Sequence, residues 1–483
     1  MLECYAPQKF FYWFEKITQI PRPSFHEAKI CDFVEAFAVS HNLVYYRDET
    51  HNILLRVPAT AGYENEPPIL LQSHMDMVAQ KEDGVAFDFT RDPIRLTVSG
   101  NELRAKGTTL GADDAGGMAI MLAIADSPDL PHPALELLFT AQEEVGLLGI
   151  QKFDCSLLRS RRMINLDCGR MHNISVSSAG ALGTVAEETF QTTAAEGTLL
   201  RVKISGGIGG HSGLEIHKNR ACAANILGEL LVEAGKAYPI HLVSMDTPRP
   251  AILGEINAAF LVEQGQAAPV CQAITETFAR IRQRYTVTDP ALHLEICAED
   301  AVSCDALSQY DSMRAIRLLF MLRTGVKKHD AEDPSIILTS AVINAVKLAS
   351  GQFLLEYTVR AVEDQEKSLH GAIAKETFSL LDFSMCVTKD YPGWPKQPHS
   401  EMVALVDKVH QDIFGYLPGH QYIHGGIEVG VIAGALGQMD AVGMLTSMAN
   451  AHTPKEVLYI DQVPDYWKLI TAVLAEKVSA ASE

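Results

Sequence analysis

The sequence predicts an α/β domain, with helices flanking a sheet, that is interrupted by an inserted α+β domain. Short apolar runs bounded by turn residues alternate with helical patterns up to residue 183. From Thr184 the predicted strands have one exposed face, and α/β character returns after the proline-rich segment DYPGWPKQPHS (Asp390–Ser400). At 483 residues the chain is long enough for two or three domains. We therefore expect a first part at 1–183, an insertion at 184–388 and a second part at 389–483.

The first part contains three short strand patterns that end in polar residues. These are PPILLQSHMDMV, with the apolar run Ile69–Leu71, then ALELLFTAQEE and RMINLDCG. Other expected elements are helices at 10–20, 27–41 and Gly116–Asp126 and a short strand at Asn52–Val57. Because ligand sites in open α/β sheets gather at the carboxyl ends of the strands, we expect a site at this edge.

The insertion combines strand and helix patterns. LLRVKISGGIGG and AILGEINAAFLV have the pattern of strands with one exposed face, and Ala221–Ala237 and Val270–Tyr285 have helical spacing. This α+β pattern extends to about Cys386. In the second part we expect helices at Met402–Phe414 and Val463–Val478.

Composition limits the class of partner and the compartment. The formal net charge of −20 argues against a nucleic-acid partner, because phosphate binding needs clustered Lys and Arg. No segment approaches the ~20 apolar residues of a membrane helix, and the first residues have no signal-peptide pattern. The nine cysteines are scattered and form no CxxC pair, which fits a reducing compartment. We expect a cytoplasmic protein without a membrane partner.

His74 and Asp76 form an H-x-D pattern directly after the first buried strand. Residues two apart on an extended backbone point the same way, so Asp76 could reach the imidazole or the site beside it. A carboxylate that orients the imidazole is a common partner of a metal-binding His. Taken alone, the pattern is better explained as a chance occurrence in a loop.

Asp113 and Asp114 lie in TTLGADDAGG, at the start of the predicted Gly116 helix. Acidic residues at a helix N-terminus are ordinarily capping residues. The surrounding glycines let the backbone approach a ligand closely. A carboxylate can also bridge two metal ions about 3.5–4 Å apart, as in two-metal hydrolases.

Glu143 and Glu144 end the second strand, and Asp167 ends the third. Adjacent carboxylates repel each other unless cations neutralise them. One of the two Glu residues could bind a metal while the other takes a proton from a water molecule. Cys168 is more simply explained as a buried, inert thiol than as a ligand.

Taken together, one His and several carboxylates at strand ends make a mixed N/O set that suits Zn²⁺ or Mn²⁺. A two-metal site of this kind lacks one His. His424 in HGGIE and His452 in NAHTPKE are both candidates.

The ordered motifs SHMDMV, TTLGADDAGG, AQEEVG, INLDCG, GGHSGLEIH, YPGW, HGGIEVG and AHTPKE resemble one family over the whole chain. It is the aminoacyl-histidine (Xaa-His) or cytosol nonspecific dipeptidase family, within the carboxypeptidase-G2-like and carnosinase-like zinc peptidases. The resemblance implies a catalytic domain with a mixed sheet flanked by helices and an inserted α+β lid domain. It also implies a homodimer through the lid and two Zn²⁺ per subunit, with Mn²⁺ or Co²⁺ as substitutes. The implied substrate is a small peptide.

The resemblance assigns roles to individual residues. His74 and Asp167 would bind one zinc, Glu144 and His452 the other, and Asp113 would bridge both. Asp76 would orient His74, and Glu143 would be the general base in the hydrolysis of dipeptides (Xaa-His and broader) by a water that two metal ions activate. In the lid, His211 would polarise the scissile carbonyl, often from the neighbouring subunit, and Arg360 would pair with a substrate carboxylate. Glu428 would contact the substrate's amino end.

The chain departs from the family at two positions. Asp114 stands where the family often has Asn, which adds a negative charge beside the bridging residue. In TSAVINAV, Val342 stands where the family has a substrate-binding Asn, and Asn344 is two positions further on, able to face the same side.

Three other functions compete with dipeptide hydrolysis. No G-x-S-x-G elbow is present, which argues against a serine hydrolase. A deacylase or amidohydrolase acting on N-acyl amino acids fits the same fold, and an inactive metal-binding scaffold is a further alternative. Retention of both Asp76 and Glu143 argues against the scaffold, because only catalysis needs both.

Overall fold

The computed structural model describes residues 1–248 and 252–477, and its chain divides into two compact units. The first unit consists of Met1–Ser178 and Trp394–Glu483, and the second of Ala179–Gly393. The boundaries expected from the sequence lie further inside the insertion, at 183/184 and 388/389. The observed boundaries lie outside β9 (Gly180–Thr189) and β17 (Ser384–Tyr391), which pair with each other and so belong to one sheet.

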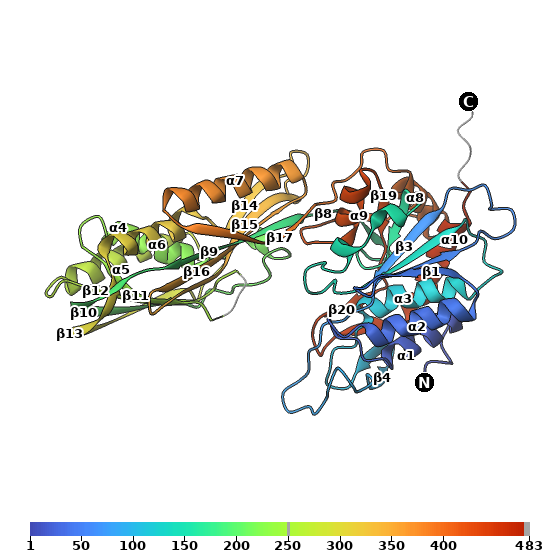
Figure 1. The fold of residues 1–483 in the computed structure, drawn as a ribbon, viewed down its shortest axis with the longest axis horizontal. Coiled ribbons are helices and arrows are strands. Elements are labelled where there is room, and N and C mark those ends of the chain that lie inside the picture. The colour runs from blue at the N-terminus through green and yellow to red at the C-terminus, as the bar shows by residue number, and fades with distance from the viewer. Residues whose placement is uncertain (249–251, 478–483) are drawn as a thin grey trace. The chain divides into compact units, whose positions relative to one another are not determined.

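The first unit is built on a mixed eight-stranded sheet in the order β1-β2-β6-β3-β7-β19-β8-β18. Figure 1 shows α1, α2 and α3 stacked side by side next to this sheet. The strands are β1 (Val44–Arg47), β2 (Ile53–Val57), β3 (Ile69–His74), β6 (Leu135–Thr140), β7 (Arg162–Asn165), β8 (Asn173–Ser178), β18 (Gly419–Ile423) and β19 (Asp440–Gly443). The helices are α1 (Gln8–Thr18), α2 (Ala28–Ser40), α3 (Ala112–Ala125), α8 (Glu401–Phe414), α9 (Glu428–Leu436) and α10 (Val463–Ala475).

Strands β6, β3 and β7 form the centre of this sheet, and all their residues are buried. They run parallel, with His74 opposite Thr140 and Gln72 opposite Asn165, so their carboxyl ends meet at one edge. A central parallel strand is covered on both faces, which explains the continuous apolar runs in its sequence. The segments after β3, β6 and β7 carry the predicted site residues to this edge.

A small sheet, β20-β21-β5-β4, lies in the same unit. Its strands are β4 (Leu96–Ser99), β5 (Glu102–Ala105), β20 (Met448–Ala449) and β21 (Val457–Tyr459). The turn from β20 to β21 contains His452, which has a positive φ of 64°. The late histidine is thus positioned by a different sheet from the one that carries His74.

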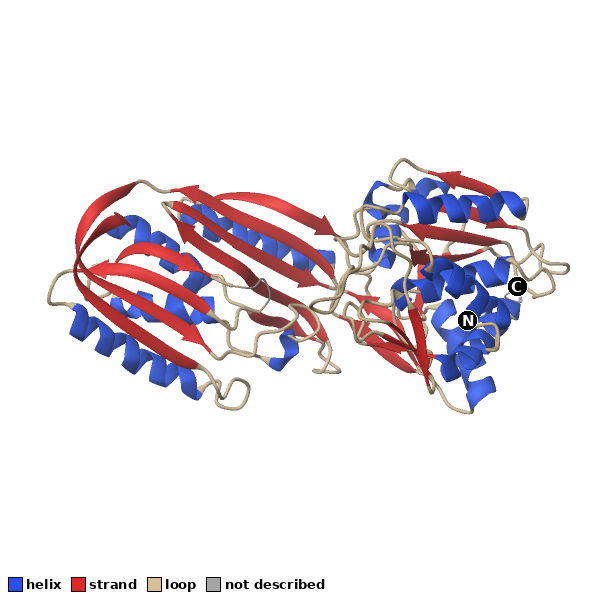
Figure 2. Ribbon diagram, turned by 90° about the horizontal axis from the view of Figure 1, so that it is seen from below, coloured by secondary structure: helices blue, strands red, loops and turns tan. Residues whose placement is uncertain are grey.

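The second unit is a nine-stranded antiparallel sheet in the order β13-β10-β12-β11-β15-β16-β9-β17, with β14 on β15. Helices α4, α5, α6 and α7 lie along this sheet in Figure 1, and Figure 2 shows the long strands. The helices are α4 (Ala223–Ala234), α5 (Ala267–Gln283), α6 (Gln309–Met321) and α7 (Asp364–Leu380). The remaining strands are β10 (Thr192–Ser205), β11 (His241–Asp246), β12 (Ile256–Val262), β13 (His293–Leu307), β14 (Gly325–His329), β15 (Ile337–Ala349) and β16 (Gln352–Ala361).

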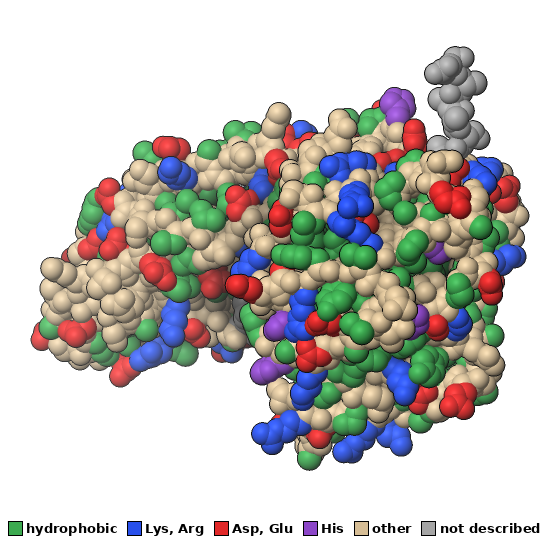
Figure 3. Space-filling model, turned by 45° about the vertical axis from the view of Figure 1, so that its right-hand side comes forward, with side chains coloured by type: hydrophobic (Ala, Val, Ile, Leu, Met, Phe, Trp, Pro, Cys, Tyr) green, Lys and Arg blue, Asp and Glu red, His purple; other side chains and the backbone are tan. Residues whose placement is uncertain are grey.

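The fold class is the one that the sequence predicted, with an α/β first unit and an α+β second unit. Two residues of the predicted elements lie outside the described residues. They are Ala251, in the strand pattern AILGEINAAFLV, and Val478, at the end of the last predicted helix. Among the helices of the described residues, none is long and apolar enough to cross a membrane. On the face drawn in Figure 3, acidic and basic side chains are intermixed.

Candidate metal centre

His74 is fully buried at the end of β3, and its two ring nitrogens face different partners. Nδ1 lies 3.1 Å from the main-chain oxygen of Asp76 and 3.5 Å from its Oδ1. Nε2 lies 3.0 Å from Asp113 Oδ1 and 3.4 Å from Asp167 Oδ1. With Nδ1–H donating to the main-chain oxygen of Asp76, Nε2 is the nitrogen that faces the carboxylates and the one that would bind a metal ion.

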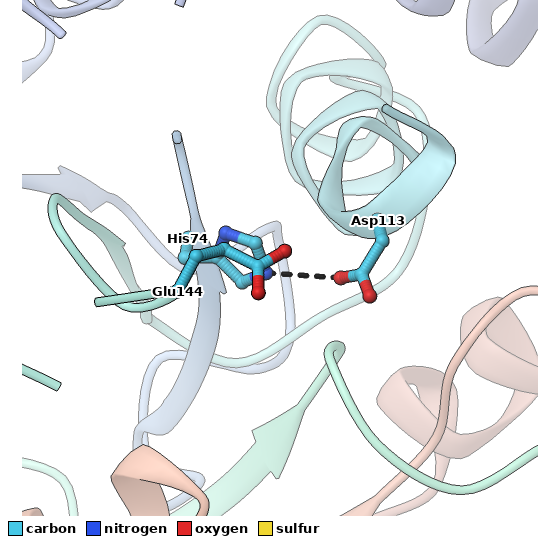
Figure 4. A group of neighbouring side chains, drawn as sticks. All are labelled: His74, Asp113 and Glu144. Carbon is cyan, nitrogen blue, oxygen red and sulfur yellow. Dashed lines mark hydrogen bonds and ion pairs between the residues drawn. The ribbon is translucent and has the colours of Figure 1, made fainter. Parts of the chain in front are cut away.

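Asp113 reaches two histidines, one with each carboxylate oxygen. Its Oδ1 faces His74, and its Oδ2 lies 3.2 Å from Nε2 of His452. The same His452 nitrogen lies 3.0 Å from Oε1 of Glu144. Figure 4 shows His74, Asp113 and Glu144 converging on one space. Asp113 therefore lies between a His74 group and a His452 group.

Asp113 does not cap α3. Its φ and ψ of −81° and 104° are non-helical, so the side chain turns away from the helix. Asp114, the next residue, caps the helix instead, because its Oδ1 accepts from the main-chain N–H of Gly117 at 2.9 Å. Its Oδ2 also lies 2.5 Å from Ser73 Oγ. The capping explanation considered for this pair thus holds for Asp114 but not for Asp113.

The carboxylate of Asp76 holds the segment that follows β6. Its Oδ1 accepts from the main-chain N–H of Glu143 at 3.0 Å, and its Oδ2 accepts from that of Glu144 at 3.3 Å. Ser24 Oγ donates to the same Oδ2 at 2.8 Å. Asp76 therefore fixes His74 and the two glutamates relative to one another.

Electrostatics in this cluster are dominated by burial and by the crowding of carboxylates. Burial, followed by the charge of Asp167, raises the pKa of Glu143 well above its usual range. Burial also raises the pKa of Glu144 and of Asp167. Burial opposes protonation of His74, but Asp167, Asp113 and Asp76 together raise its pKa well above the usual value. A divalent cation among these groups would neutralise their repulsion.

The residues fit a bound metal ion. Among the described residues, ligand atoms of His74, Asp113 and Glu144 lie within 4.8 Å of one another, and so do those of His74, Asp114 and Asp167. Metal–ligand bonds of ~2.0–2.2 Å place two ligands of one tetrahedral zinc about 3.4 Å apart. The contacts of Asp113 with His74 and His452, at 3.0 and 3.2 Å, are close to that spacing.

Cys168 and His424 do not join these groups. Cys168 is buried, and burial raises the pKa of its thiol well above the usual value, as in an inert structural cysteine. His424 is buried as well, and neither His424 nor His452 belongs to the groups of potential metal ligands found among the described residues. Of the two late histidines, His452 is the one that lies beside Glu144 and Asp113.

Glu428 is fully buried at the first turn of α9. One of its oxygens accepts hydrogen bonds from Gln72 Nε2 and, at 2.7 Å, from Thr140 Oγ1. Burial raises the pKa of this carboxyl to about 8. Its contact with a substrate stays a prediction.

Arg22 is a buried residue of the centre that the sequence analysis missed. Its Nη1 donates to the main-chain oxygens of Met75 and Asp76 at 2.7 and 2.9 Å, and its Nη2 donates to that of Gly111. The guanidinium thus joins the segment after His74 to the segment before Asp113. A lone Arg in IPRPS belongs to no motif, so the sequence carried no signal for it.

Glu456 is a second buried residue of the centre to which the sequence patterns assigned no role. Its carboxylate accepts from the main-chain N–H groups of Leu110 and Gly111 at 2.8 and 2.9 Å and from that of Asp113 at 3.2 Å. Burial raises its pKa to about 7. Because Glu456 follows His452 by four positions, it ties the His452 turn to the Asp113 loop. Glu456 is the last residue of the AHTPKE motif, but the family resemblance assigned no role to this position.

Three of the site residues predicted from the sequence, His211, Asn344 and Arg360, lie in the second unit. The Nδ1 of His211 accepts from the main-chain N–H groups of Gly213 and Leu214 at 3.2 and 2.9 Å, which leaves Nε2 as the protonated nitrogen. Asn344 lies at a bulge in β15 and donates from Nδ2 to Thr358 Oγ1 at 2.6 Å. Thr358 is the cross-strand partner of Val342, so Asn344 faces the side that Val342 faces.

Arg360, on β16, is 8% exposed. Its Nε has no hydrogen-bond partner among the residues that the structure describes. Buried guanidinium groups are normally paired, so this cation is available for an anionic ligand.

A histidine and carboxylates at the carboxyl ends of parallel strands, joined through one aspartate to a second histidine, define a metal-binding hydrolase. Comparison with known proteins identifies the class more closely. Residues 70–476 match the model of peptidase family M20/M25/M40, and the chain belongs to this family of metallopeptidases.

Individual relatives agree with this assignment. The chain is 30% identical to the cytosol non-specific dipeptidase of Escherichia coli strain K12 over 478 residues, or 98% of each chain. The crystal structure of aminoacylhistidine dipeptidase from Vibrio alginolyticus has a TM-score of 0.87 and 26% identity, covering 100% of this chain and 99% of that one. An aminopeptidase of Bacillus cereus shares the fold, with a TM-score of 0.59 and 16% identity over 98% of both chains.

Replacing Arg22 by Met should lower the free energy of unfolding by about 3 kcal/mol or more, because the carbonyls of Met75, Asp76 and Gly111 lose their buried donor. Urea unfolding followed by circular dichroism measures this. Arg91→Met is the matched control, because the Arg91 side chain is 82% exposed. Equal losses in the two variants would contradict the role given to Arg22.

Replacing Glu215 by Gln should destabilise the protein by less than about 1 kcal/mol at pH 7. Glu215 accepts from the His211 N–H and pairs with Lys218 and Arg220, and these contacts, led by Lys218, lower its pKa to about 2. A carboxyl with a lowered pKa stabilises the fold above its ordinary value of 4.5, and this contribution is lost as the pH falls towards 2. The difference between the urea midpoints of the two proteins should therefore be largest at pH 7 and should shrink steadily as the pH falls from 4.5 towards 2. A difference in urea midpoint that is the same at every pH would contradict this role of the Glu215 carboxylate.

Proposed function

We propose that this chain hydrolyses dipeptides, including Xaa-His dipeptides, at a centre of two metal ions. The single observation that carries the proposal is that the two oxygens of Asp113 face His74 and His452 separately. A bridging carboxylate of this kind is the hallmark of two-metal hydrolases. The names of the two full-length relatives, a non-specific dipeptidase and an aminoacylhistidine dipeptidase, support dipeptides as the substrate class.

His74 and Asp167 would hold one ion, Glu144 and His452 the other, and Asp113 both. We propose Zn²⁺, with Mn²⁺ or Co²⁺ as substitutes, because the ligands are imidazole nitrogens and carboxylate oxygens. When bound, such ions lower the pKa of a water molecule and polarise the scissile carbonyl. Asp76 keeps His74 in the correct tautomer through its main-chain oxygen and holds Glu143 and Glu144 through its carboxylate.

Glu143 would be the general base. Its carboxylate takes a proton from the attacking water and passes that proton to the leaving amine. Its raised pKa suits a group that must hold the proton between these two steps. The hydrogen bond from its N–H to Asp76 keeps the residue at the end of β6.

The second unit would supply contacts to the substrate. The protonated Nε2 of His211 donates to the oxygen that becomes negative in the transition state, a contact commonly worth about 2.7–4 kcal/mol. Arg360 binds the substrate carboxylate, Asn344 contacts the substrate beside it, and Glu428 of the first unit contacts the amino end. Recognition of both ends restricts the enzyme to short peptides.

We also propose that the protein is cytoplasmic and that it forms a homodimer through its second unit. The Escherichia coli relative is named a cytosol dipeptidase, which supports the compartment. Scattered cysteines, all of them free, fit the same compartment.

Zinc-loaded protein should hydrolyse Ala-His and other dipeptides faster than N-acyl amino acids, and a chelator should abolish turnover until Zn²⁺ or Mn²⁺ is restored. The physical reason is that the carboxylates and His74 cannot polarise a carbonyl without the cations. Liberated amino acids are quantified by chromatography. Turnover of N-acyl amino acids alone would favour the deacylase alternative, and dipeptide turnover that survives chelation would contradict the proposal.

Glu143→Gln should lower kcat for Ala-His by about 10²–10⁴-fold, because the water loses its base. The variant should still bind two zinc ions, since Glu143 is not among the proposed ligands. Glu144→Gln is the matched comparison and should lose zinc as well as activity. Zinc content is measured by atomic emission after gel filtration. An active Glu143→Gln enzyme, or one that has lost its zinc, would count against the assignment.

A further inference from the structure

Among the described residues, one face of the second unit's sheet carries no α-helix and only the short 3-10 helix at Ile216–Lys218, and Arg360 lies on this face. Along β16, Arg360 and Thr358 alternate with Val359, which belongs to the helix-covered core. The partner of Val359 on β9 is Leu182, which contacts Gly371 of α7. Arg360 and Thr358 therefore project to the opposite, open face.

Lys389 lies on the same open face, two strands away. Arg360 is opposite Ala181, and Thr358 is opposite Gly183. On the other side of β9, Gly183 is opposite Lys389. Directly opposed residues of antiparallel strands project to the same face, so this face carries two cations, one on each side of β9.

Between the two cations, β9 presents only small side chains. A Cβ atom placed on Gly183 would lie 2.6 Å from Lys389 Cγ and 2.9 Å from Cε. The lysine stem therefore lies across Gly183, towards β16, and does not extend away from the sheet. Lys389 therefore covers Gly183, and the small residue Ala181 lies opposite Arg360.

Among the described residues, neither of these two cations forms an ion pair. The Nε of Arg360 is also buried without a hydrogen-bond partner among these residues. Burial, then the charge of Arg360, lowers the pKa of Lys389, which indicates that the two groups influence each other. Glu356 acts in the opposite direction but forms no ion pair with Lys389. Two neighbouring cations of this kind are best neutralised by two carboxylates.

We propose that Lys389 is a specificity-determining residue that binds the side-chain carboxylate of a dipeptide whose C-terminal residue is acidic. The inference rests on the proposed dipeptide hydrolysis, in which Arg360 takes the terminal carboxylate. Lys389, whose stem crosses Gly183 from β17 towards β16, then takes the second. A C-terminal Glu carries its two carboxylates at the ends of a five-carbon chain, so glutarate reproduces their spacing.

The first test compares zinc-loaded enzyme on Ala-Glu and on its isosteric neutral counterpart Ala-Gln. Wild type should show a kcat/KM about tenfold higher for Ala-Glu, as expected for one charge-assisted contact in a partly buried site. In Lys389→Met this ratio should fall to about one, and in Lys389→Arg it should be retained. Lys375→Met, on the exposed side of α7, is the matched control and should keep the wild-type ratio. A ratio of about one in wild type, or a ratio unchanged in Lys389→Met, would overturn the inference.

The second test does not depend on turnover. Calorimetry of the zinc-loaded protein should show glutarate binding about tenfold more tightly than glutaramate, which has a single carboxylate. Lys389→Met should remove that preference. Equal affinity for the two compounds in wild type would overturn the two-cation site even if dipeptides are hydrolysed. A glutarate preference without any dipeptide turnover would support the site and contradict the proposed function instead.

Discussion

The double contact of Asp113 is the interaction on which the rest of the first unit depends. One carboxylate must reach His74, at the end of a parallel strand of the mixed sheet, and His452, in the turn between two strands of the small sheet. These residues are far apart in sequence, and each belongs to a different sheet. A shift of either sheet by the width of one atom would break one of the contacts, because ligand distances tolerate only about 0.2 Å. The surrounding backbone therefore has to be held firmly before any metal binds.

Buried polar side chains provide that restraint. Arg22 binds main-chain oxygens on both sides of the centre, and Glu456 binds three main-chain N–H groups of the Asp113 loop. Asp76 does the same for the loop that carries Glu143 and Glu144. Each of these groups has several partners, which offsets the cost of burying its charge. Among the described residues of the second unit, no comparable network of hydrogen bonds holds Arg360, which leaves the charge of this residue to be paired by a ligand.

The α/β and α+β classes could be predicted because apolar runs and turn residues reveal elements locally. The strand ends also indicated His74, Glu143, Glu144 and Asp167 as neighbours, since parallel strands align their carboxyl ends. Local patterns could not separate His452 from His424, because that choice depends on how two sheets pack; only family resemblance favoured His452. Nor could they reveal Arg22 or Lys389. The role of Arg22 follows from contacts with backbone, which leave no sequence pattern, and the position of Lys389 follows from register across β9.

The most direct test of the central claim is anomalous X-ray scattering at the zinc absorption edge from crystals of the zinc-loaded protein. The account predicts two peaks about 3.5–4 Å apart with the Asp113 carboxylate between them. One peak should be flanked by His74 and Asp167, and the other by Glu144 and His452. A single peak, or two peaks that Asp113 does not bridge, would contradict it.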